Sequence, residues 1–393
     1  MPEAAQTELT CQHSEICGGC TYRGVPYEEQ LRIKDEEIRS ALSEKALAAG
    51  TILPIKGAPS ISSYRNKMEY TFGDEVKGGP MTLGMHKKMS YMSVVNVPDC
   101  KIVHGDFEKV RSSVLEYFLV SGHSHYHKKT HRGLLRNLVL RRGERTNQLL
   151  VNLVTTDHEE FDKQAFADMV RSLPLDSALA GILHTVNNKR ADAIFREELA
   201  PLFGQGYYTE RMMDLDFKVE PFAFFQTNTA AFEGMLRDAV ALLPEIRGTL
   251  FDVYCGTGAI ALSLSHSADR VYGLELSEEA VSSAKENARL GGIDNCEFIC
   301  GDALESMELL AEKGIAPDCL VVDPPRMGIH PKAVKKILGF GLPSLLYISC
   351  NPKSFAENMA MFADAGYRLQ TLRGYDNFPF TRHIELTAFI VKA

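Results

Sequence analysis

FDVYCGTGAIA, from Phe251 to Ala261, is the stretch of this sequence that says most about its architecture. An apolar run comes first, Gly256 and Gly258 follow, and small helix-forming residues close the stretch. Two glycines at such a turn let the backbone bend sharply and approach a ligand closely. The stretch therefore predicts a strand, a glycine-rich turn and a helix, the opening unit of a nucleotide-binding α/β sheet.

Strand-like and helix-like runs alternate through the rest of the C-terminal half. The expected strands cover Thr249–Tyr254, Arg270–Leu276, Cys296–Asp302, Cys319–Pro325 and Leu345–Cys350. The expected helices cover Gly258–Ala268, Ser277–Gly292, Ala303–Lys313 and Pro331–Leu338. This alternation is typical of a Rossmann-like, doubly wound α/β sheet.

The 393 residues are too many for one ordinary hydrophobic core, so we expect several domains. Changes of pattern predict an N-terminal segment over 1–60, a β-rich central domain over 61–206 and the α/β domain over 207–393. The first segment should hold a helix from Pro26 to Gly50, because proline suits a first helical position and glycine a stop.

The central domain is expected to be antiparallel, with one interrupting helix from about Glu160 to Leu173. Its expected strands lie in Arg65–Gly73, Met89–Val97, Leu134–Arg142 and Asn147–Thr156.

The composition is that of a soluble globular protein, with 45% hydrophobic and 24% charged residues. No apolar run reaches membrane-spanning length, and the N-terminus has neither the basic region nor the apolar core of a signal peptide. We therefore expect a cytoplasmic protein without a membrane partner. In that reducing compartment, the nine cysteines favour metal binding or catalysis over disulfides.

A basic island interrupts this acidic chain, whose net charge is −8. From His123 to Arg142 there are six Lys/Arg, four His and no acidic residue. Such an island is the expected electrostatic footprint of RNA contact, and its alternative is a solvated loop leading into a strand. The histidines have no Cys or carboxylate among them, which disfavours a metal site there.

Acidic or nucleophilic residues end the later strands of the α/β half, where such sheets bind their ligands. Glu275 comes about twenty residues after Gly256, where a carboxylate accepts bonds from ribose hydroxyls. Asp302 has an alternative role as the N-cap of the next helix. The glycine pattern alone also allows a dinucleotide site. Asp323 in VVDPPR and Cys350 in YISCNP favour instead a class I S-adenosylmethionine methyltransferase.

A thiol at this edge suggests covalent chemistry on a uracil ring. Carbon 5 of uracil is a poor nucleophile until a thiolate adds to carbon 6, and a base must later remove the carbon-5 proton. Cys350 is the candidate nucleophile, and Arg326 is a candidate for promoting its ionisation. Glu385 in FPFTRHIELTAFI is the candidate base; its alternative is an ordinary solvent-facing strand position, sharing a face with His383 and Thr387.

Six motifs together resemble the RNA uracil-C5 methyltransferase family, which makes 5-methyluridine in 23S rRNA and tRNA. In chain order they are FFQTN (Phe224–Asn228), DVYCGTG, GLEL, DPPR, YISCNP and HIE. The resemblance implies that Cys350 is the nucleophile and Glu385 the base. It also implies donor and active-site roles for a further set of residues: Gln226, Tyr254, Gly256, Gly258, Glu275, Asp302 and Asp323. The family often has Asn where Ala259 stands, so no contact is expected there.

Cys11, Cys17 and Cys20 have a ligand-like spacing, with Gly18-Gly19 between the last two. Cys100 is the expected fourth ligand, because the other five cysteines lie in the methyltransferase half. Four cysteines suit tetrahedral zinc as well as an iron–sulfur cluster. In the family that the chain resembles, this pattern holds a 4Fe-4S cluster.

The resemblance implies RNA as the partner and favours 23S rRNA, because the tRNA branch lacks these cysteines. The alternatives are a tRNA enzyme and a non-catalytic iron–sulfur RNA-binding protein. Many rRNA members begin with a TRAM-type domain, for which the ten residues before Cys11 leave no room. No feature indicates an obligate protein partner.

Overall fold

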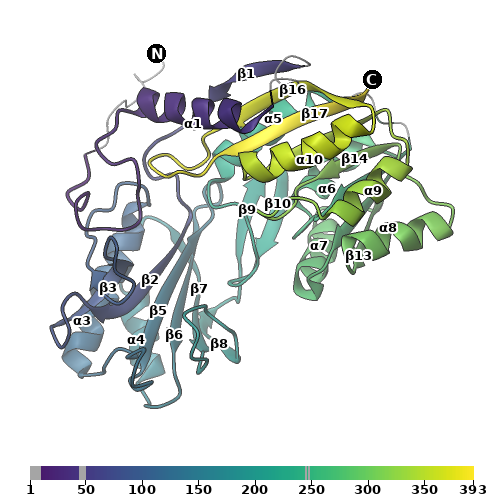
Figure 1. Ribbon diagram of the computed structural model, residues 1–393. Helices are drawn as coiled ribbons and strands as arrows, with labels where there is room; N and C mark the ends of the chain where they lie inside the picture. The colour runs from purple at the N-terminus through teal and green to yellow at the C-terminus, as the bar shows by residue number, and fades with distance from the viewer. Residues whose placement is uncertain (1–9, 44–49, 244–245, 247) are drawn as a thin grey trace.

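The computed structural model describes residues 10–43, 50–243, 246 and 248–393, and it has two lobes (Figure 1). The described residues form a seven-stranded sheet, an eight-stranded sheet and a two-stranded hairpin. Figure 1 shows the lobe of β2, β5 and β6 at the lower left and the lobe of β16 and β17 above it, with α1 at the top beside β16.

The seven-stranded sheet has the order β4-β3-β2-β5-β6-β7-β8, and helices α3 and α4 pack on it. Its strands are β2 (Lys67–Asp74), β3 (Met81–His86), β4 (Val94–Val95), β5 (Leu135–Arg142), β6 (Gln148–Thr155), β7 (Ala178–Val186) and β8 (Glu198–Gly204). The helices are α3 (Gly105–Ser121) and α4 (Lys163–Arg171). Neighbouring strands are antiparallel except β6 and β7, which run parallel because α4 connects them as a crossover. The predicted stretches pair antiparallel as expected, whereas β7, which the sequence analysis did not predict, adds the parallel pair.

The eight-stranded sheet has the order β1-β16-β17-β15-β14-β11-β12-β13. Its strands are β1 (Thr51–Lys56), β11 (Thr249–Val253), β12 (Arg270–Glu275), β13 (Cys296–Cys300), β14 (Cys319–Val322), β15 (Ser344–Ser349), β16 (Tyr367–Tyr375) and β17 (Glu385–Lys392). All neighbouring pairs are parallel except those that β17 makes with β15 and β16. The expected doubly wound α/β sheet is confirmed, and β17 inserts antiparallel between two strands that point the same way.

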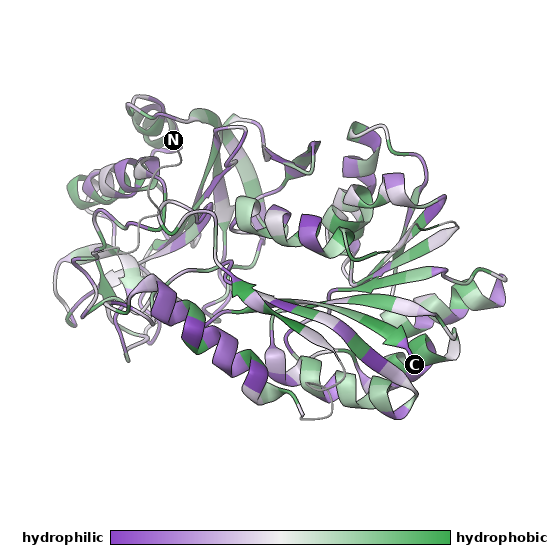
Figure 2. Ribbon diagram, turned by 90° about the horizontal axis from the view of Figure 1, so that it is seen from above, coloured by the Kyte–Doolittle hydropathy of each residue, from purple (hydrophilic) through white to green (hydrophobic). Residues whose placement is uncertain are grey.

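Helices cover both faces of this sheet, and the sheet separates two hydrophobic cores. One core contains residues of α1 (Tyr27–Ala41), α8 (Ala303–Glu312), α9 (Pro331–Gly339) and α10 (Pro352–Asp364). The other contains residues of α5 (Thr229–Val240), α6 (Ala259–Ser263), α7 (Glu278–Leu290) and the hairpin of β9 (Tyr208–Met212) and β10 (Leu215–Val219). Seen from above (Figure 2), the helices carry both hydrophilic and hydrophobic residues, as expected for elements with one face in a core.

The N-terminal segment belongs structurally to the C-terminal sheet. Strand β1 pairs in parallel with β16 at the sheet edge, a connection that the sequence did not predict. Helix α1 ends at Ala41 with Leu42 as its C-cap, so the prediction that the helix continues to Gly50 was wrong from Leu42 onward. Residues 44–49, which the predicted helix also covered, lie outside the described residues. Its buried side chains include Gln30, Lys34 and Ile38, two of them polar.

Candidate active site

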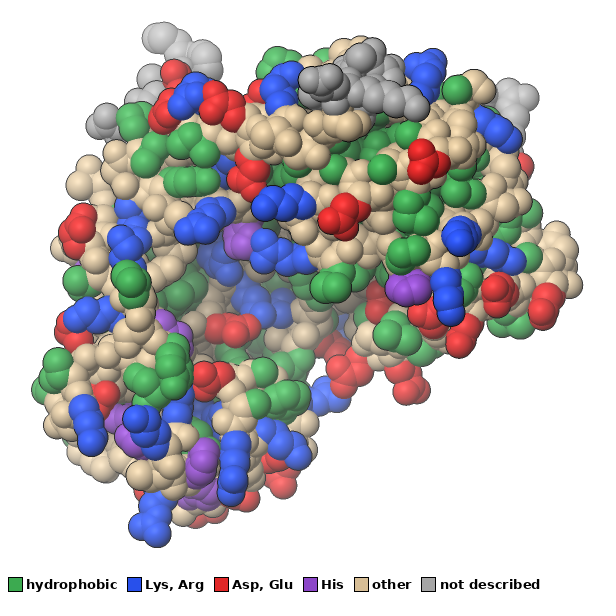
Figure 3. Space-filling model, in the orientation of Figure 1, with side chains coloured by type: hydrophobic (Ala, Val, Ile, Leu, Met, Phe, Trp, Pro, Cys, Tyr) green, Lys and Arg blue, Asp and Glu red, His purple; other side chains and the backbone are tan. Residues whose placement is uncertain are grey.

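A pocket of about 1040 Å³ opens between the two lobes, at the carboxyl ends of β11, β12, β14 and β15. Figure 3 shows the hollow between the lobes, with Lys, Arg and His side chains gathered around it. The pocket is lined by Cys350, Glu385 and six of the seven predicted donor-site residues: Gln226, Tyr254, Gly256, Glu275, Asp302 and Asp323. These predicted residues, up to 159 positions apart in the chain, thus share one cavity.

The glycine turn after β11 has a conformation that its sequence explains. Tyr254, Gly256 and Gly258 all have positive φ, at 70°, 54° and 82°. A Cβ on Gly256 would meet no atom within 4 Å, so this position is open to a ligand. A Cβ on Gly258 would lie 3.0 Å from Ala284 and Phe298, so this glycine serves the close packing of α6 rather than the pocket wall.

Glu275 fixes the glycine turn from the end of β12. Its Oε2 accepts a hydrogen bond from the Gly256 amide at 3.1 Å, and its Oε1 accepts one from the Ser277 amide at 2.9 Å. Both carboxylate oxygens therefore have backbone partners, and the side chain still lines the pocket. Lone pairs remaining on these oxygens could accept bonds from ligand hydroxyls.

Asp302 has the helix N-cap role that the sequence offered as the alternative to ligand binding. It is the N-cap of α8, and its Oδ1 accepts hydrogen bonds from the Leu304 and Glu305 amides at 2.9 and 3.4 Å. It also lines the pocket, so the capping role and a ligand-facing position coexist in one residue.

Asp252 is a buried carboxyl group that sequence reasoning missed. Its Oδ2 accepts a hydrogen bond from the Ala261 amide at 2.8 Å, whereas Oδ1 has no hydrogen-bond partner among the described residues. Burial, and then the nearby Asp323, raises the pKa of Asp252 to about 8. Burial alone raises the pKa of Asp323 to about 7. The donor side of the pocket is thus crowded with carboxyl groups, an arrangement that favours a cationic ligand.

The opposite wall comes from the segment between β10 and α5 and from the start of β2. Gln226 lines the pocket, and its carbonyl accepts a hydrogen bond from the Asn66 side chain at 3.1 Å. Phe224 also lines the pocket while 71% of its surface is exposed, and Arg65 lies on the same wall. Arg65 and Asn66 were not predicted as site residues; they open the expected strand Arg65–Gly73. An exposed aromatic and an arginine that line one pocket are suited to stacking on a base.

The YISCNP motif places Cys350 at the mouth of a fully buried strand. All six residues of β15 are buried, and Cys350 follows directly. Asn351 then caps α10 by accepting a hydrogen bond from the Lys353 amide at 3.1 Å. Its Nδ2 donates to the carbonyl of Arg326 at 2.8 Å. The asparagine therefore ties the DPPR loop to the strand end that presents the thiol.

The environments of Cys350 and Glu385 are coupled. Burial, then Glu385 and Asp323, raises the pKa of the Cys350 thiol to about 11, while Arg326 lowers it. Burial and Asp323 raise the pKa of Glu385 to about 8, again opposed by Arg326. Glu385 is partly accessible at the first position of β17, whereas Thr387 is fully buried. The solvent-facing alternative for Glu385 was therefore wrong: the side chain faces a pocket.

The four N-terminal cysteines lie near one another. Burial first, and then Cys100, Cys17 and Cys11, raise the pKa of Cys20 to about 12. Burial likewise raises the pKa of Cys100 to about 11, with contributions from Cys17 and Cys11. The fold therefore brings Cys100 within electrostatic range of the Cys11–Cys20 turn.

Part of the basic island is structural rather than a free surface. Arg136 is 5% exposed and donates hydrogen bonds to the carbonyls of Asn187, Lys189 and Ala191. Arg141 is 2% exposed and donates to the Ala223 carbonyl at 2.7 Å. The expectation that the whole island contacts RNA was wrong for these two arginines, because β5 turns them inward.

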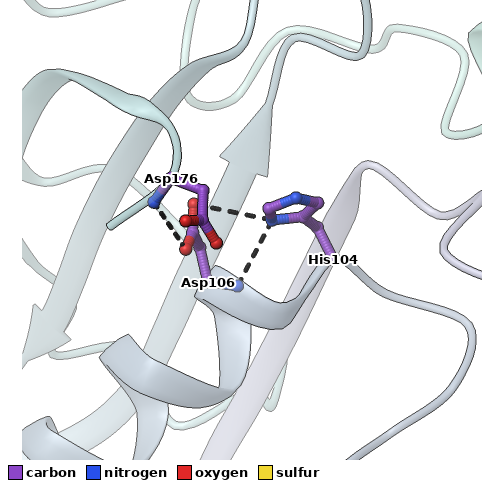
Figure 4. Close-up of side chains that lie close together, drawn as sticks. All are labelled: His104, Asp106 and Asp176. Carbon is purple, nitrogen blue, oxygen red and sulfur yellow. Dashed lines mark hydrogen bonds and ion pairs between the residues drawn. The ribbon is translucent and has the colours of Figure 1, made fainter. Parts of the chain in front are cut away.

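A different cluster, His104, Asp106 and Asp176, brings three possible metal-ligand atoms within 4.8 Å of one another (Figure 4). Lys109 already supplies a cation there, donating to Asp106 at 3.1 Å and to Asp176 at 2.8 Å. Asp106 also accepts hydrogen bonds from the Asp176 and Ser177 amides. These bonds explain the cluster as a structural network around the start of α3.

Known proteins resemble this chain over its whole length. The family model described as tRNA (Uracil-5-)-methyltransferase matches residues 207–393. An uncharacterized RNA methyltransferase of Clostridium acetobutylicum is 41% identical over 391 residues, which are 99% of this chain and 85% of the relative. Another, of Caldanaerobacter subterraneus subsp. tengcongensis, is 40% identical over 99% of this chain and 86% of the relative.

Among solved structures, the chain is similar to the Pyrococcus abyssi tRNA (uracil-54, C5)-methyltransferase in complex with S-adenosyl-L-homocysteine. The TM-score is 0.77 and the identity 25%, over 95% of this chain and 86% of the other. The fold and the pocket define a methyltransferase with a Rossmann-like sheet. The relatives show that the chain belongs to a family of RNA methyltransferases, and its residues 207–393 match the tRNA (Uracil-5-)-methyltransferase model.

Proposed function

We propose that this enzyme transfers a methyl group from S-adenosyl-L-methionine to carbon 5 of a uridine in RNA, through a covalent bond between Cys350 and carbon 6. The observation that carries the proposal is the meeting of Cys350, Glu385 and Arg326 in one pocket with the acid-lined glycine turn. The similar Pyrococcus enzyme binds the demethylated donor, which supports this donor here.

Each residue then has a task that its surroundings suit. Glu275 and the Gly256 backbone hold the nucleoside part of the donor, whose methylsulfonium group supplies the methyl when bound. Phe224 and Arg65 are positioned to receive a uracil that has left its stack, a step that costs a few kcal/mol and least in a loop. Asp323, which lines the pocket and has a pKa near 7, supplies negative charge on the donor side in its ionised form, where a sulfonium cation is favoured.

The bond changes balance without a further reactant. The Cys350 thiolate adds to carbon 6, and carbon 5 gains the electron pair with which it attacks the methyl group. The bond between that methyl and the donor sulfur breaks, and its electron pair stays on the sulfur, which leaves as a neutral thioether. Glu385 then removes the carbon-5 proton, and the returning electrons expel the thiolate from carbon 6. The raised pKa of Glu385, about 8, makes its ionised form a stronger base toward the carbon-5 proton, which passes to solvent before the next turnover.

We propose that Cys11, Cys17, Cys20 and Cys100 hold a 4Fe-4S cluster. The Cys20 and Cys100 thiols each lie within electrostatic range of Cys11 and Cys17, so the fold gathers the four thiols that such a cluster needs. The residues fit the cluster, which has no redox step to perform in this methyl transfer.

We favour 23S rRNA as the substrate, because the resemblance associates these cysteines with the rRNA enzymes. A tRNA substrate is the second candidate, since the family model and the similar solved structure are both named for tRNA. Mapping 5-methyluridine in rRNA and tRNA from a deletion strain separates the two. The nine cysteines, which suit a reducing compartment, support a cytoplasmic site of action. Among the described residues, no helix has the length and apolar character needed to cross a bilayer.

The covalent mechanism is tested with RNA containing 5-fluorouridine, whose carbon-5 fluorine cannot be removed by a base. With the donor present, we expect a stable protein–RNA adduct on a denaturing gel from the wild type and none from Cys350→Ala. Cys300→Ala, which removes an exposed thiol in the same domain, is the matched control. Equal adducts from the wild type and Cys350→Ala would place the nucleophile elsewhere.

A further inference from the structure

The loop Asp376–Ile384 between β16 and β17 links the pocket to the other lobe. It brings Phe378 and His383 to the pocket wall and leads directly into Glu385. Its middle points away from the pocket: Phe380 is 5% exposed and packs in the core of the seven-stranded sheet. The geometry of the proposed base therefore depends on what holds this loop.

The peptide groups of Phe380 are held by the N-terminal segment. The amides of Thr21 and Tyr22 both donate to the Phe380 carbonyl, at 2.8 and 2.9 Å. The Phe380 amide donates to Oε1 of Gln30 on α1, at 2.8 Å. Thr21 directly follows Cys20, so the cysteine turn and the loop are joined by hydrogen bonds one residue away from a proposed metal ligand.

A buried ion pair fixes the start of the same loop. Lys34 Nζ lies 2.6 Å from Asp376 Oδ1, and neither side chain has exposed surface. Lys34 also donates to the Phe378 carbonyl at 3.4 Å. Gln30 and Lys34 are four residues apart and so lie on one face of α1. Replacing a buried ion pair by apolar residues is often neutral for stability. Stability alone therefore does not explain why Lys34 and Asp376 form an ion pair at a loop that reaches the pocket.

We propose that the Cys11–Cys20 turn and the Gln30–Lys34 face of α1 position the loop that carries Glu385. The cysteine site is then a remote support of the base, and Lys34, Asp376 and Gln30 are positioning residues. This inference rests on the proposed covalent mechanism. It separates two steps: attack by Cys350, held on β15, does not need the loop, whereas proton removal by Glu385 does.

The first experiment compares Lys34→Met with the double variant Lys34→Met/Asp376→Leu. The single variant leaves Asp376 buried without its partner and should unfold at a lower temperature; the double variant removes both charges and should recover most of that loss. We expect both to form the 5-fluorouridine adduct within threefold of the wild-type rate. On ordinary RNA, both should turn over at least tenfold more slowly and accumulate the methylated covalent intermediate. Tyr367→Phe is the matched control: it loses one buried hydrogen bond, to Leu342, at the far end of β16.

The outcomes are distinguishable. A double variant with wild-type turnover would overturn the inference and leave the ion pair a structural one. A parallel loss of adduct formation and turnover would also overturn it, because the loop would then serve the whole pocket. If the wild type forms no adduct, the proposed function itself is contradicted, and this inference falls with it.

The second experiment tests the cysteine end without measuring activity. Hydrogen exchange at the Phe380 amide should be at least tenfold faster in Cys20→Ser than in the wild type, because the turn no longer holds the Phe380 carbonyl. Cys300→Ser, an exposed position in the other lobe, should leave this exchange unchanged. Unchanged exchange in Cys20→Ser would show that the turn does not support the loop.

Discussion

Two thiol sites in this molecule differ in the charges around them. Cys350 stands beside two carboxyl groups and one guanidinium, which together with burial leave the pKa of its thiol at about 11. Cys20 stands beside three other thiols, and burial is the main reason that its pKa lies near 12. Both thiols are protonated at neutral pH, and each needs positive charge to become a thiolate.

The source of that charge sets the function of each site. Four neighbouring thiols repel one another once ionised, so they ionise together only around metal ions. A single thiol near Arg326 can ionise transiently when a cationic donor arrives, and in the proposed mechanism it then attacks the uracil ring. The burial of a cysteine thiol therefore does not by itself indicate its function; the charges next to the thiol do.

Among the variants that test this comparison, we expect the largest effect on turnover from Glu385→Gln. Removing the base should slow turnover by about 10²–10⁴-fold, the usual contribution of general acid–base catalysis. Attack by Cys350 should persist, since glutamine also removes a group that raises the pKa of the thiol. The variant should therefore accumulate a methylated covalent complex on ordinary RNA, observable on a denaturing gel. Free multiple turnover would contradict the role of Glu385.

The next effect concerns the metal at the other site. Cys100→Ser should lose most of the bound iron and acid-labile sulfide when the protein is purified anaerobically, because a cluster site with three thiolates is incomplete. Cys350→Ala should keep a four-to-four ratio of iron to sulfide. We expect the unfolding temperature to fall in Cys100→Ser only, since metal binding stabilises the folded state. Zinc in place of iron in the wild type would contradict the cluster.

Much of the C-terminal sheet could be predicted because its signals are local. The predicted strand over 270–276 is observed as β12, and the helix over 277–292 as α7, with ends shifted by one or two residues. Strand β1 could not be predicted in this sheet, since its partner β16 lies more than 300 residues away and pairing across such a distance leaves no local pattern.

Local sequence also fails to say which way a side chain points. Helix α1 buries the polar side chains of Gln30 and Lys34 beside Ile38, and no local pattern predicts this, since their partners Phe380 and Asp376 come from the far end of the chain. The basic island has the same limit, because a run of charges does not reveal that Arg136 faces inward. The thiol and base were identifiable from motifs, but their coupling through Asp323 required the fold.

A smaller effect is expected from Arg326→Gln. The guanidinium lowers the pKa of both Cys350 and Glu385, so its removal should shift both titrations to higher pH. Arg326 is exposed, and such charges contribute less than about 1 kcal/mol, or under about one pH unit. The measurement is the pH dependence of Cys350 alkylation by iodoacetamide, followed by mass spectrometry. Arg382→Gln, another exposed arginine two residues from Ile384, is the control for unspecific charge loss; an equal shift there would contradict a specific role for Arg326.

Asp323→Asn should give the opposite and smallest shift. This carboxyl group raises the pKa of Cys350 and of Glu385, so its neutral analogue should move the alkylation profile of Cys350 to lower pH. Because burial raises the pKa of Asp323 itself to about 7, the group is largely neutral below that value and exerts its effect only above it. The wild type and Asp323→Asn should therefore have similar alkylation rates near pH 6 and differ increasingly toward pH 9. Alkylation of the free enzyme avoids any loss of donor binding in this variant. An equally large difference in alkylation rate at pH 6 would mean that Asp323 acts through the shape of the pocket and not through its negative charge. If Arg326→Gln and Asp323→Asn move the profile in the same direction, the contrast between a charge-controlled thiol and the four metal-binding thiols would not stand.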